Sequence, residues 1–220
     1  MLLLALDTAT EKASLALLAA GGLRAEFTLE SPGTYLKHLL PAIEEMFLAA
    51  GASWEEVGAI AVGQGPGNFT GLRIGVATAK SLAWARGLPL VAVSTLEVLA
   101  AQLPFQEHPI AVLVDARRQE LFFGLYRCLE EWPELVEGPL RLPAAALPAR
   151  LTPPVVLTGP GLNRYGDLLH PTLPGGARWA PPEQRHPRAA TLGRLAWRLL
   201  QQGKSSPPES LTPTYLRPAL

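Results

Sequence analysis

The chain has 220 residues, of which 48% are hydrophobic and 17% are charged, and 19 basic residues balance 19 acidic ones. This length and composition exclude disorder over most of the chain and allow one large or two small domains with a real core. The charge balance argues against a broad basic surface for nucleic acid and leaves only a local patch.

Cysteine content and the first residues point to a cytoplasmic protein. Cys128 is the only cysteine, so the sequence excludes an internal disulfide and a thiolate metal cluster. Residues 1–7 have no basic segment ahead of their apolar run, and no apolar run is long enough to cross a bilayer. We therefore expect a soluble chain with no membrane association.

Apolar periodicity predicts alternating strands and helices along the chain. In the first half we expect strands over 2–6, 13–19, 23–29, 57–62 and 88–93, and helices over about 35–50, 70–86 and 94–103. In the second half we expect strands over 110–114, 120–127 and 155–157, and a helix over about 189–202. Six prolines in 132–154 leave room for at most one short helix, and 170–187 should be irregular.

The two halves share an order of elements. Each opens with an apolar strand that ends in an aspartate, Asp7 or Asp115, and returns in a second strand after a polar turn. Each later has a strand followed by Gly-Pro-Gly, at 65–67 and at 159–161. We therefore predict a duplicated α/β unit, with domains at 1–104 and 105–220. Such halves suit the actin-like and sugar-kinase architecture, in which two ribonuclease H-like domains flank a cleft.

A glycine-rich loop between the strand at 57–62 and the next helix is the strongest local feature. Strand, glycine turn and helix N-terminus bring backbone N–H groups together, which suits an anion. The loop is neither a Walker loop nor a dinucleotide fingerprint. It either binds phosphate or only lets the chain turn tightly into the helix. The candidate phosphate residues are Gly65, Gly67, Asn68, Thr70 and Gly71.

The string from Gly65 to Gly75, Gly-Pro-Gly-Asn-Phe-Thr-Gly-Leu-Arg-Ile-Gly, closely resembles the bacterial TsaB (YeaZ) family. Further matches to that family run along most of the chain, with small departures at Asn68, where members often have Ser, and at 35–36, where they often have His-Ser. The further matching segments are Leu6-Asp-Thr8, Leu39-Leu-Pro41, Asp115-Ala-Arg117 with Glu120, and Pro213-Thr-Tyr-Leu-Arg217.

The resemblance implies a ribonuclease H-like fold of the actin superfamily. It also implies a role in making threonylcarbamoyladenosine next to the anticodon of tRNAs that read ANN codons. In that role the chain would be the non-catalytic partner of the related transferase TsaD, joined by the ATPase TsaE, and would meet tRNA through the complex. It implies no cofactor of its own and leaves ATP or ADP as a candidate ligand at the complex interface. Homodimerisation of the chain alone stays open.

The residues themselves offer no catalytic or metal site. The histidines form no His-x-x-x-His pair and Gly-x-Ser-x-Gly is absent, so we expect no metal and no catalytic residue. Asp7 and Thr8 are candidates for a vestigial nucleotide site, although Asp7 could equally cap its own turn. The alternative function is a stand-alone actin-superfamily ATPase or small-molecule kinase that uses Asp7. The histidines are His38, His108, His170 and His186.

The helices of the first half are the predicted partner surface. Gly71, Gly75 and Ala79 recur at four-residue spacing, which would let another helix approach closely. The apolar arc that does not pack on the sheet is either further core or a subunit interface, and the resemblance places the partner contact on part of 36–47 and 71–83. Arg73 and Lys80 are candidates for rim or anion contacts, or are plain solvated charges. The candidate interface residues are Leu36, Leu39, Leu40, Ile43, Phe47, Leu72, Gly75, Val76 and Ala79.

Overall fold

A computed structural model describes residues 1–20, 22–30 and 35–216, with the side chains of residues 35 and 36 left out. The chain divides into two units. Unit 1 comprises Met1–Thr95 and Arg188–Thr214, and unit 2 comprises Leu96–Pro187 and Tyr215–Leu220.

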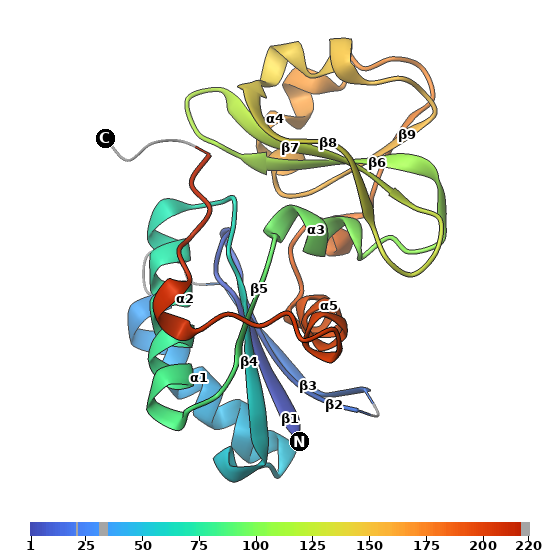
Figure 1. Cartoon of the computed structure of the whole chain (residues 1–220). Coiled ribbons are helices and arrows are strands. Elements are labelled where there is room, and N and C mark those ends of the chain that lie inside the picture. The colour runs from blue at the N-terminus through green and yellow to red at the C-terminus, as the bar shows by residue number, and fades with distance from the viewer. Residues whose placement is uncertain (21, 31–34, 217–220) are drawn as a thin grey trace. The chain divides into compact units, whose positions relative to one another are not determined.

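Unit 1 has a five-stranded sheet in the order β3-β2-β1-β4-β5 (Figure 1). Strand β1 pairs antiparallel with β2 and parallel with β4. Within the described residues its elements are β1 (Leu2–Asp7), β2 (Ala13–Ala19), β3 (Gly22–Leu29), α1 (Tyr35–Ala50), η1 (Trp54–Glu56), β4 (Val57–Gly63), α2 (Phe69–Arg86), β5 (Leu90–Val93), α5 (Ala189–Gln201) and η5 (Pro208–Ser210).

Unit 2 repeats this order in its own sheet, β8-β7-β6-β9-β10. Strand β6 pairs antiparallel with β7 and parallel with β9, as β1 does with β2 and β4. The predicted duplication is therefore confirmed. Within the described residues the elements of unit 2 are α3 (Thr95–Ala100, whose first residue still belongs to unit 1), β6 (Gln106–Asp115), β7 (Glu120–Cys128), β8 (Glu134–Pro143), η2 (Ala144–Ala146), η3 (Pro148–Arg150), β9 (Val155–Thr158), α4 (Gly161–Leu169), β10 (Ala177–Trp179) and η4 (Pro182–Gln184).

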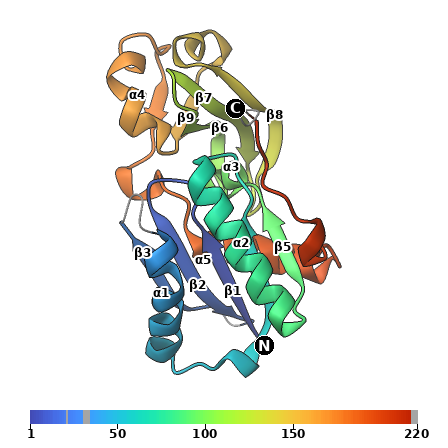
Figure 2. The same cartoon turned by 90° about the vertical axis from the view of Figure 1, so that its left-hand side faces the viewer.

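The central strand of unit 1 is buried on both faces, as its unbroken apolar sequence requires. Leu2, Leu4 and Leu6 share a core cluster with residues of α1 and α2. Figures 1 and 2 show α1 and α2 on one face of this sheet and α5 on the other. Because helices cover both faces of the sheet around β1, the carboxyl end of this strand is held in a fixed position.

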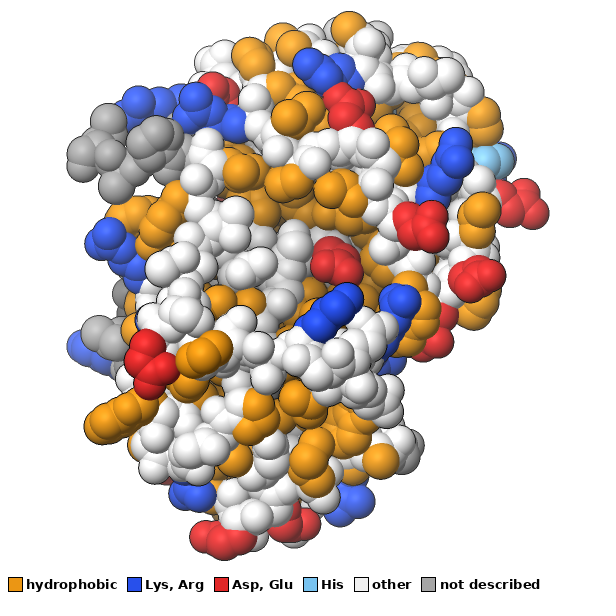
Figure 3. Space-filling model, in the orientation of Figure 1, with side chains coloured by type: hydrophobic (Ala, Val, Ile, Leu, Met, Phe, Trp, Pro, Cys, Tyr) orange, Lys and Arg blue, Asp and Glu red, His pale blue; other side chains and the backbone are white. Residues whose placement is uncertain are grey.

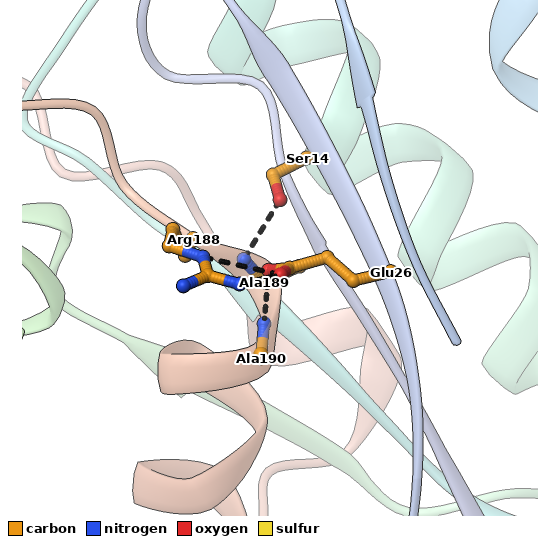
Figure 4. Close-up of polar contacts among 5 residues, drawn as sticks. All are labelled: Ser14, Glu26, Arg188, Ala189 and Ala190. Atoms are coloured by element: carbon orange, nitrogen blue, oxygen red, sulfur yellow. Dashed lines mark hydrogen bonds and ion pairs between the residues drawn. The ribbon is translucent and has the colours of Figure 1, made fainter. Parts of the chain in front are cut away.

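Helix α5 is tied to the first sheet by side chains that satisfy its first backbone N–H groups (Figure 4). Ala189 N donates to Ser14 Oγ over 2.8 Å, and Ala190 N donates to Glu26 Oε1 over 3.0 Å. Glu26 also forms an ion pair with Arg188, which precedes the helix. A helix late in the sequence is therefore attached to one face of the first sheet.

The structure divides the chain differently from the predicted domains 1–104 and 105–220. The first boundary lies after Thr95, and residues 188–214 return to unit 1. Leu96 and Leu99 of α3 are buried in a core cluster of unit 2. Helix α3, which follows the last strand of the first half, therefore belongs largely to unit 2. Helix α5, from the second half of the sequence, belongs to unit 1. The sequence carried no signal of this exchange, because an apolar helix face fits either sheet.

The second half also holds three elements that the sequence did not lead us to expect. Strand β8 includes Pro139 and ends at Pro143, which an edge strand tolerates because its outer N–H groups need no ladder partner. The short strand β10 lies in 170–187, which was predicted to be irregular. Helix α4 follows the second Gly-Pro-Gly, as α2 follows the first.

Candidate functional site

The turn after β1 and the glycine loop after β4 pack directly on each other. Thr8 Oγ1 donates to the Gly71 carbonyl oxygen over 2.7 Å, and Asn68 N donates to the Ala9 carbonyl oxygen over 2.7 Å. A Cβ at Gly67 would lie 2.2 Å from that Ala9 oxygen. Only glycine fits at this distance, so the loop's composition is explained by the approach of the chain's own backbone.

Helix α2 meets the same turn with its small residues. A Cβ at Gly71 would lie 2.1 Å from the Thr8 carbonyl oxygen, and one at Gly75 would lie 2.1 Å from Thr8 Oγ1. The prediction that this stripe admits another helix is wrong at these two positions, because the β1–β2 turn fills the space. Ala79, the third member, is fully buried in the core of unit 1.

The loop also anchors two later segments of unit 1. Thr95 N donates to the Gly65 carbonyl oxygen over 2.9 Å, and Thr214 N donates to the Gln64 carbonyl oxygen over 2.7 Å. Asn68 caps α2, since its Oδ1 accepts from Gly71 N over 3.0 Å. The tight-turn role of the loop is therefore visible in its own hydrogen bonds. Phosphate binding by Gly65, Gly67, Asn68, Thr70 and Gly71 stays a prediction.

Asp7 lies at the centre of this junction and is fully buried. Its Oδ1 accepts from Ala9 N over 2.8 Å, and its Oδ2 accepts from Thr95 Oγ1 over 3.2 Å. Burial raises the pKa of Asp7 from 3.8 to about 6, against the lowering effect of these two hydrogen bonds. Asp7 thus caps its own turn and fixes the start of α3. Sequence reasoning missed Thr95, because nothing near it in the chain marks a contact with β1.

The predicted partner surface is largely buried within unit 1. Of the predicted set only Leu40 is clearly exposed, with 49% of its surface accessible, and the side chain of Leu36 lies outside the described residues. The partner contact stays a prediction. The buried residues of the predicted set could not touch a partner and could contribute only by packing beneath the exposed surface. The buried members are Leu39, Ile43, Phe47, Leu72, Gly75, Val76 and Ala79.

The two cations predicted for rim or anion contacts on α2 differ in their surroundings. The Lys80 ammonium donates to the carbonyl oxygens of Glu209 and Leu211, over 3.3 and 2.8 Å, and holds the tail segment against the helix. The Arg73 guanidinium lies over the ring of Phe69, 3.9 Å from its centroid, and is exposed. Arg73 therefore lies at the surface beside Phe69, whereas Lys80 holds the tail segment.

Asp115 occupies in unit 2 the position of Asp7 in unit 1. Arg117 N donates to Asp115 Oδ1 over 2.8 Å, which repeats the bond from Ala9 N to Asp7. The Tyr165 hydroxyl of α4 donates to the same oxygen over 2.8 Å. Partial burial and the Asp115 carboxylate raise the pKa of Tyr165. Unlike Asp7, this carboxylate is also contacted by arginines.

Other candidate sites carry little chemistry. A groove of about 510 Å³ lies where the end of α2 meets the tail, and its lining is mostly apolar or backbone around Trp84, Pro89, Pro207 and Glu209. In the ranges that the structure describes, no group of three or more His, Cys, Asp or Glu residues is arranged to hold a metal ion. None of the helices found there is both long enough and apolar enough to cross a membrane.

Comparison with known proteins identifies the family. A family model described as TsaD, tRNA N6-adenosine threonylcarbamoyltransferase, matches residues 31–142. The tRNA threonylcarbamoyladenosine biosynthesis protein TsaB of Escherichia coli K12 is 31% identical, and the match covers 99% of this chain and 95% of that protein. The chain belongs to the TsaB family.

Solved structures agree with this assignment. YeaZ from Pseudomonas aeruginosa superposes with a TM-score of 0.82 at 32% identity, over 98% of this chain and 99% of that one. A ROK hexokinase from Thermus thermophilus superposes with a TM-score of 0.50 at 14% identity, over 92% of this chain and 100% of that one, which bears on the fold alone. With the duplicated sheet order, the likeness to YeaZ confirms the predicted α/β fold of two domains from a duplicated unit, and the ROK hexokinase shares that fold.

Proposed function

We propose that this TsaB family chain is a non-catalytic subunit that activates the related transferase TsaD in threonylcarbamoylation of tRNA. The observation that carries the proposal is the match, over nearly the full length of both chains, to a protein named for this pathway. The match of residues 31–142 to the transferase family model supports a second point, that the partner is a relative of the chain itself. The ATPase TsaE would complete the assembly, and ATP or ADP would bind at the interface and not within this chain.

The alternative, a stand-alone ATPase or small-molecule kinase, depends on Asp7. That residue is fully buried, and both of its carboxylate oxygens accept hydrogen bonds from the chain. No observation favours this alternative specifically, and the fold hosts both functions. Because the proposed substrate is tRNA, we infer a cytoplasmic location.

The outer stripe of α2 is the surface that we propose for the partner contact. It comprises Phe69, Arg73, Ala77, Ser81 and Trp84, which follow each other at three- or four-residue spacing and are all exposed. Arg73 is its one charged side chain, and small residues separate the two aromatic ones. Exposed aromatic residues around small side chains suit close packing of another helix.

The test is threonylcarbamoylation of an unmodified tRNA that reads an ANN codon, with purified transferase and ATPase, in the presence and absence of this chain. We expect product only when the chain is added. Equal product without it would contradict the activating role.

A second measurement separates activation from association. The chain and the transferase, mixed at micromolar concentration, should form a stable complex in analytical ultracentrifugation. Failure of the two chains to associate would count against the subunit role even if some stimulation of activity were observed.

A further inference from the structure

The turn between β6 and β7 has an unusual backbone. Arg117, Arg118 and Gln119 have φ angles of 61°, 53° and 61°, so three successive non-glycine residues adopt the left-handed conformation. Each such residue costs free energy, because its Cβ approaches the following carbonyl oxygen. A strained segment of this kind persists only where the surrounding structure fixes it, and such segments concentrate at functional sites.

Hydrogen bonds on both sides fix this turn. Glu120 N donates to the Arg117 carbonyl oxygen over 3.0 Å, and Ala116 N donates to the Glu120 carbonyl oxygen over 2.9 Å. Ala144 N donates to the Gln119 carbonyl oxygen over 2.8 Å. The backbone of this turn is therefore fixed within unit 2, and residues 117–119 are exposed.

One carboxylate positions two arginines at this turn. Asp115 Oδ2 lies 3.4 Å from an Arg117 guanidinium nitrogen and 3.5 Å from Arg164 Nε of α4. The Asp115 side chain is 15% exposed, whereas those of Arg117 and Arg164 are 53% and 51% exposed. These contacts are ion pairs without a hydrogen bond to Asp115 Oδ2, and about half of each arginine side chain stays exposed, so N–H groups of both guanidinium ions can reach an anion.

The local charge is positive although the whole chain is neutral. Arg117 and Arg164 pair with one acid, Asp115, and the neighbouring Glu120 pairs with Arg141 over 3.7 Å. Arg118 is exposed, and no partner for its side chain occurs among the described residues. On the face drawn in Figure 3, basic side chains occur in small groups among acidic ones. The cationic turn is therefore a local feature of a chain in which 19 basic residues balance 19 acidic ones.

The equivalent turn of unit 1 shows what is special here. There Thr8 is buried and Asp7 is fully buried, and α2 covers the turn. The duplicated position in unit 2 instead presents exposed arginines over its aspartate. The same fold element is closed in one unit and open in the other.

We propose that the arginine turn, defined as Arg117 and Arg118 together with the adjacent Arg164 of α4, binds phosphodiester groups of tRNA. This inference rests on the proposed function, which makes tRNA the polyanion that the complex must hold. Guanidinium groups bind phosphate oxygens in pairs, and a rigid turn loses little conformational freedom on binding. Such contacts position the RNA and carry no base specificity.

The experiment measures binding of an unmodified tRNA transcript, by fluorescence anisotropy at several salt concentrations, to the full chain and to its complex with the transferase. The double variant Arg117→Ala/Arg118→Ala should weaken binding. The plot of log K against log salt has a negative slope, and the variant should reduce its magnitude by about 0.7–0.9 for each phosphate that it no longer neutralises. The matched control is Arg127→Ala, an exposed arginine of the same unit near the far end of β7, roughly 20 Å away along the strand. An unchanged slope in the double variant, or an equal effect in the control, would overturn the proposal.

Two further arms separate the remaining explanations. Arg118→Gly removes both a charge and a left-handed non-glycine residue, so it should raise Tm while it weakens tRNA binding; a purely structural turn would change Tm alone. Inorganic phosphate serves as the second probe, and binding that the double variant loses for phosphate but keeps for tRNA would contradict the RNA assignment. Complex formation is measured separately with the same variants. If the wild-type chains fail to associate, the proposed function fails, and the slope for the chain alone still decides the RNA contact.

Discussion

The hydroxyl of Thr95 donates a hydrogen bond to Asp7 Oδ2 over 3.2 Å and so joins the carboxyl end of β1 to the first residue of α3. Gly63 closes the other side, since a Cβ there would lie 2.0 Å from the same oxygen. The carboxylate therefore sits in a tight site with two hydrogen bonds, and none of the described groups that shift its pKa is a cation. Desolvation outweighs the hydrogen bonds, so the neutral form of Asp7 persists to a higher pH than in an ordinary aspartate, up to about pH 6.

This environment predicts that stability falls as pH rises. The pKa of Asp7 is about 6 in the folded chain against 3.8 for the ordinary side chain. Folding is therefore favoured by protonation of Asp7, and this contribution is full below pH 4 and is lost as pH rises through about 6. Its size is about 3 kcal/mol for a shift of this size. Urea unfolding at pH 4.5 and 7.5 should show the loss against the background of other groups.

Asp7→Asn isolates that contribution. The amide can accept from Ala9 N and donate to Thr95 Oγ1, so the variant should be more stable than the native chain at pH 7.5 and should lack this part of the pH dependence. Asp167→Asn, at an exposed carboxylate of α4, is the control and should leave the difference between the two pH values unchanged. An Asp7→Asn profile parallel to that of the native chain would show that Asp7 is ionised when folded.

The contact of α2 with the β1–β2 turn gives a second prediction, on Gly71 and Gly75. Alanine at either position gains helix propensity of about 1 kcal/mol but clashes with Thr8 at 2.1 Å, so each variant should be destabilised by about 1–3 kcal/mol. The atoms that clash differ. At Gly75 it is the Thr8 hydroxyl, whereas at Gly71 it is the Thr8 carbonyl oxygen.

Thr8→Ala should therefore rescue Gly75→Ala and not Gly71→Ala. A double-mutant cycle from chemical unfolding measures the coupling, which should favour the pair Thr8→Ala/Gly75→Ala after the loss of the Thr8–Gly71 hydrogen bond is subtracted. Equal behaviour of the two glycine variants would mean that the turn relaxes away from α2.

Much of this architecture could be predicted from the sequence, because apolar runs and glycine turns mark the strands on each side of Asp7 and Asp115. The predicted bounds of α1 and β7 agree with the structure to within a residue. What failed depended on contacts distant in sequence. The bond from Thr95 to Asp7 and the exchange of α3 and α5 between units leave no periodic pattern, since either sheet can cover an apolar helix.

The candidate site shows the same limit. Gly71 and Gly75 were correctly recognised as places of close approach, but the approaching group was taken to be a helix, and it is the Thr8 turn. The apolar stripe of α1 and α2 was recognised too, but its burial within unit 1 could not be separated from burial against a partner. Spacing identifies which residues share a face and does not say what covers it.

A third prediction concerns the attachment of α5 to the first sheet. Ser14→Ala leaves the buried Ala189 N without its acceptor and should destabilise the chain by about 1–2 kcal/mol. Glu26→Gln keeps an acceptor for Ala190 N and loses the ion pair with the half-exposed Arg188, so it should cost about 1 kcal/mol or less. Thermal unfolding should rank the variants in this order, and salt should reduce only the effect of Glu26→Gln. A larger, salt-sensitive effect at Ser14 would contradict the capping role.

The last prediction separates surface from core on α2. Trp84 is 70% exposed and Val76 is 3% exposed on the same helix. Trp84→Ala should leave Tm nearly unchanged and weaken binding to the transferase at least tenfold, as truncation of an interfacial aromatic residue commonly does. Val76→Ala should lower stability by on the order of 2 kcal/mol through the space it opens in the core, with little effect on the affinity of the folded chain.

Leu48→Ala, at an 84% exposed position of α1, is the matched control for loss of surface apolar area. Calorimetric titration of each variant with the transferase decides the matter: native affinity for Trp84→Ala together with reduced affinity for Val76→Ala would mean that the contact uses the buried stripe after a rearrangement of α2.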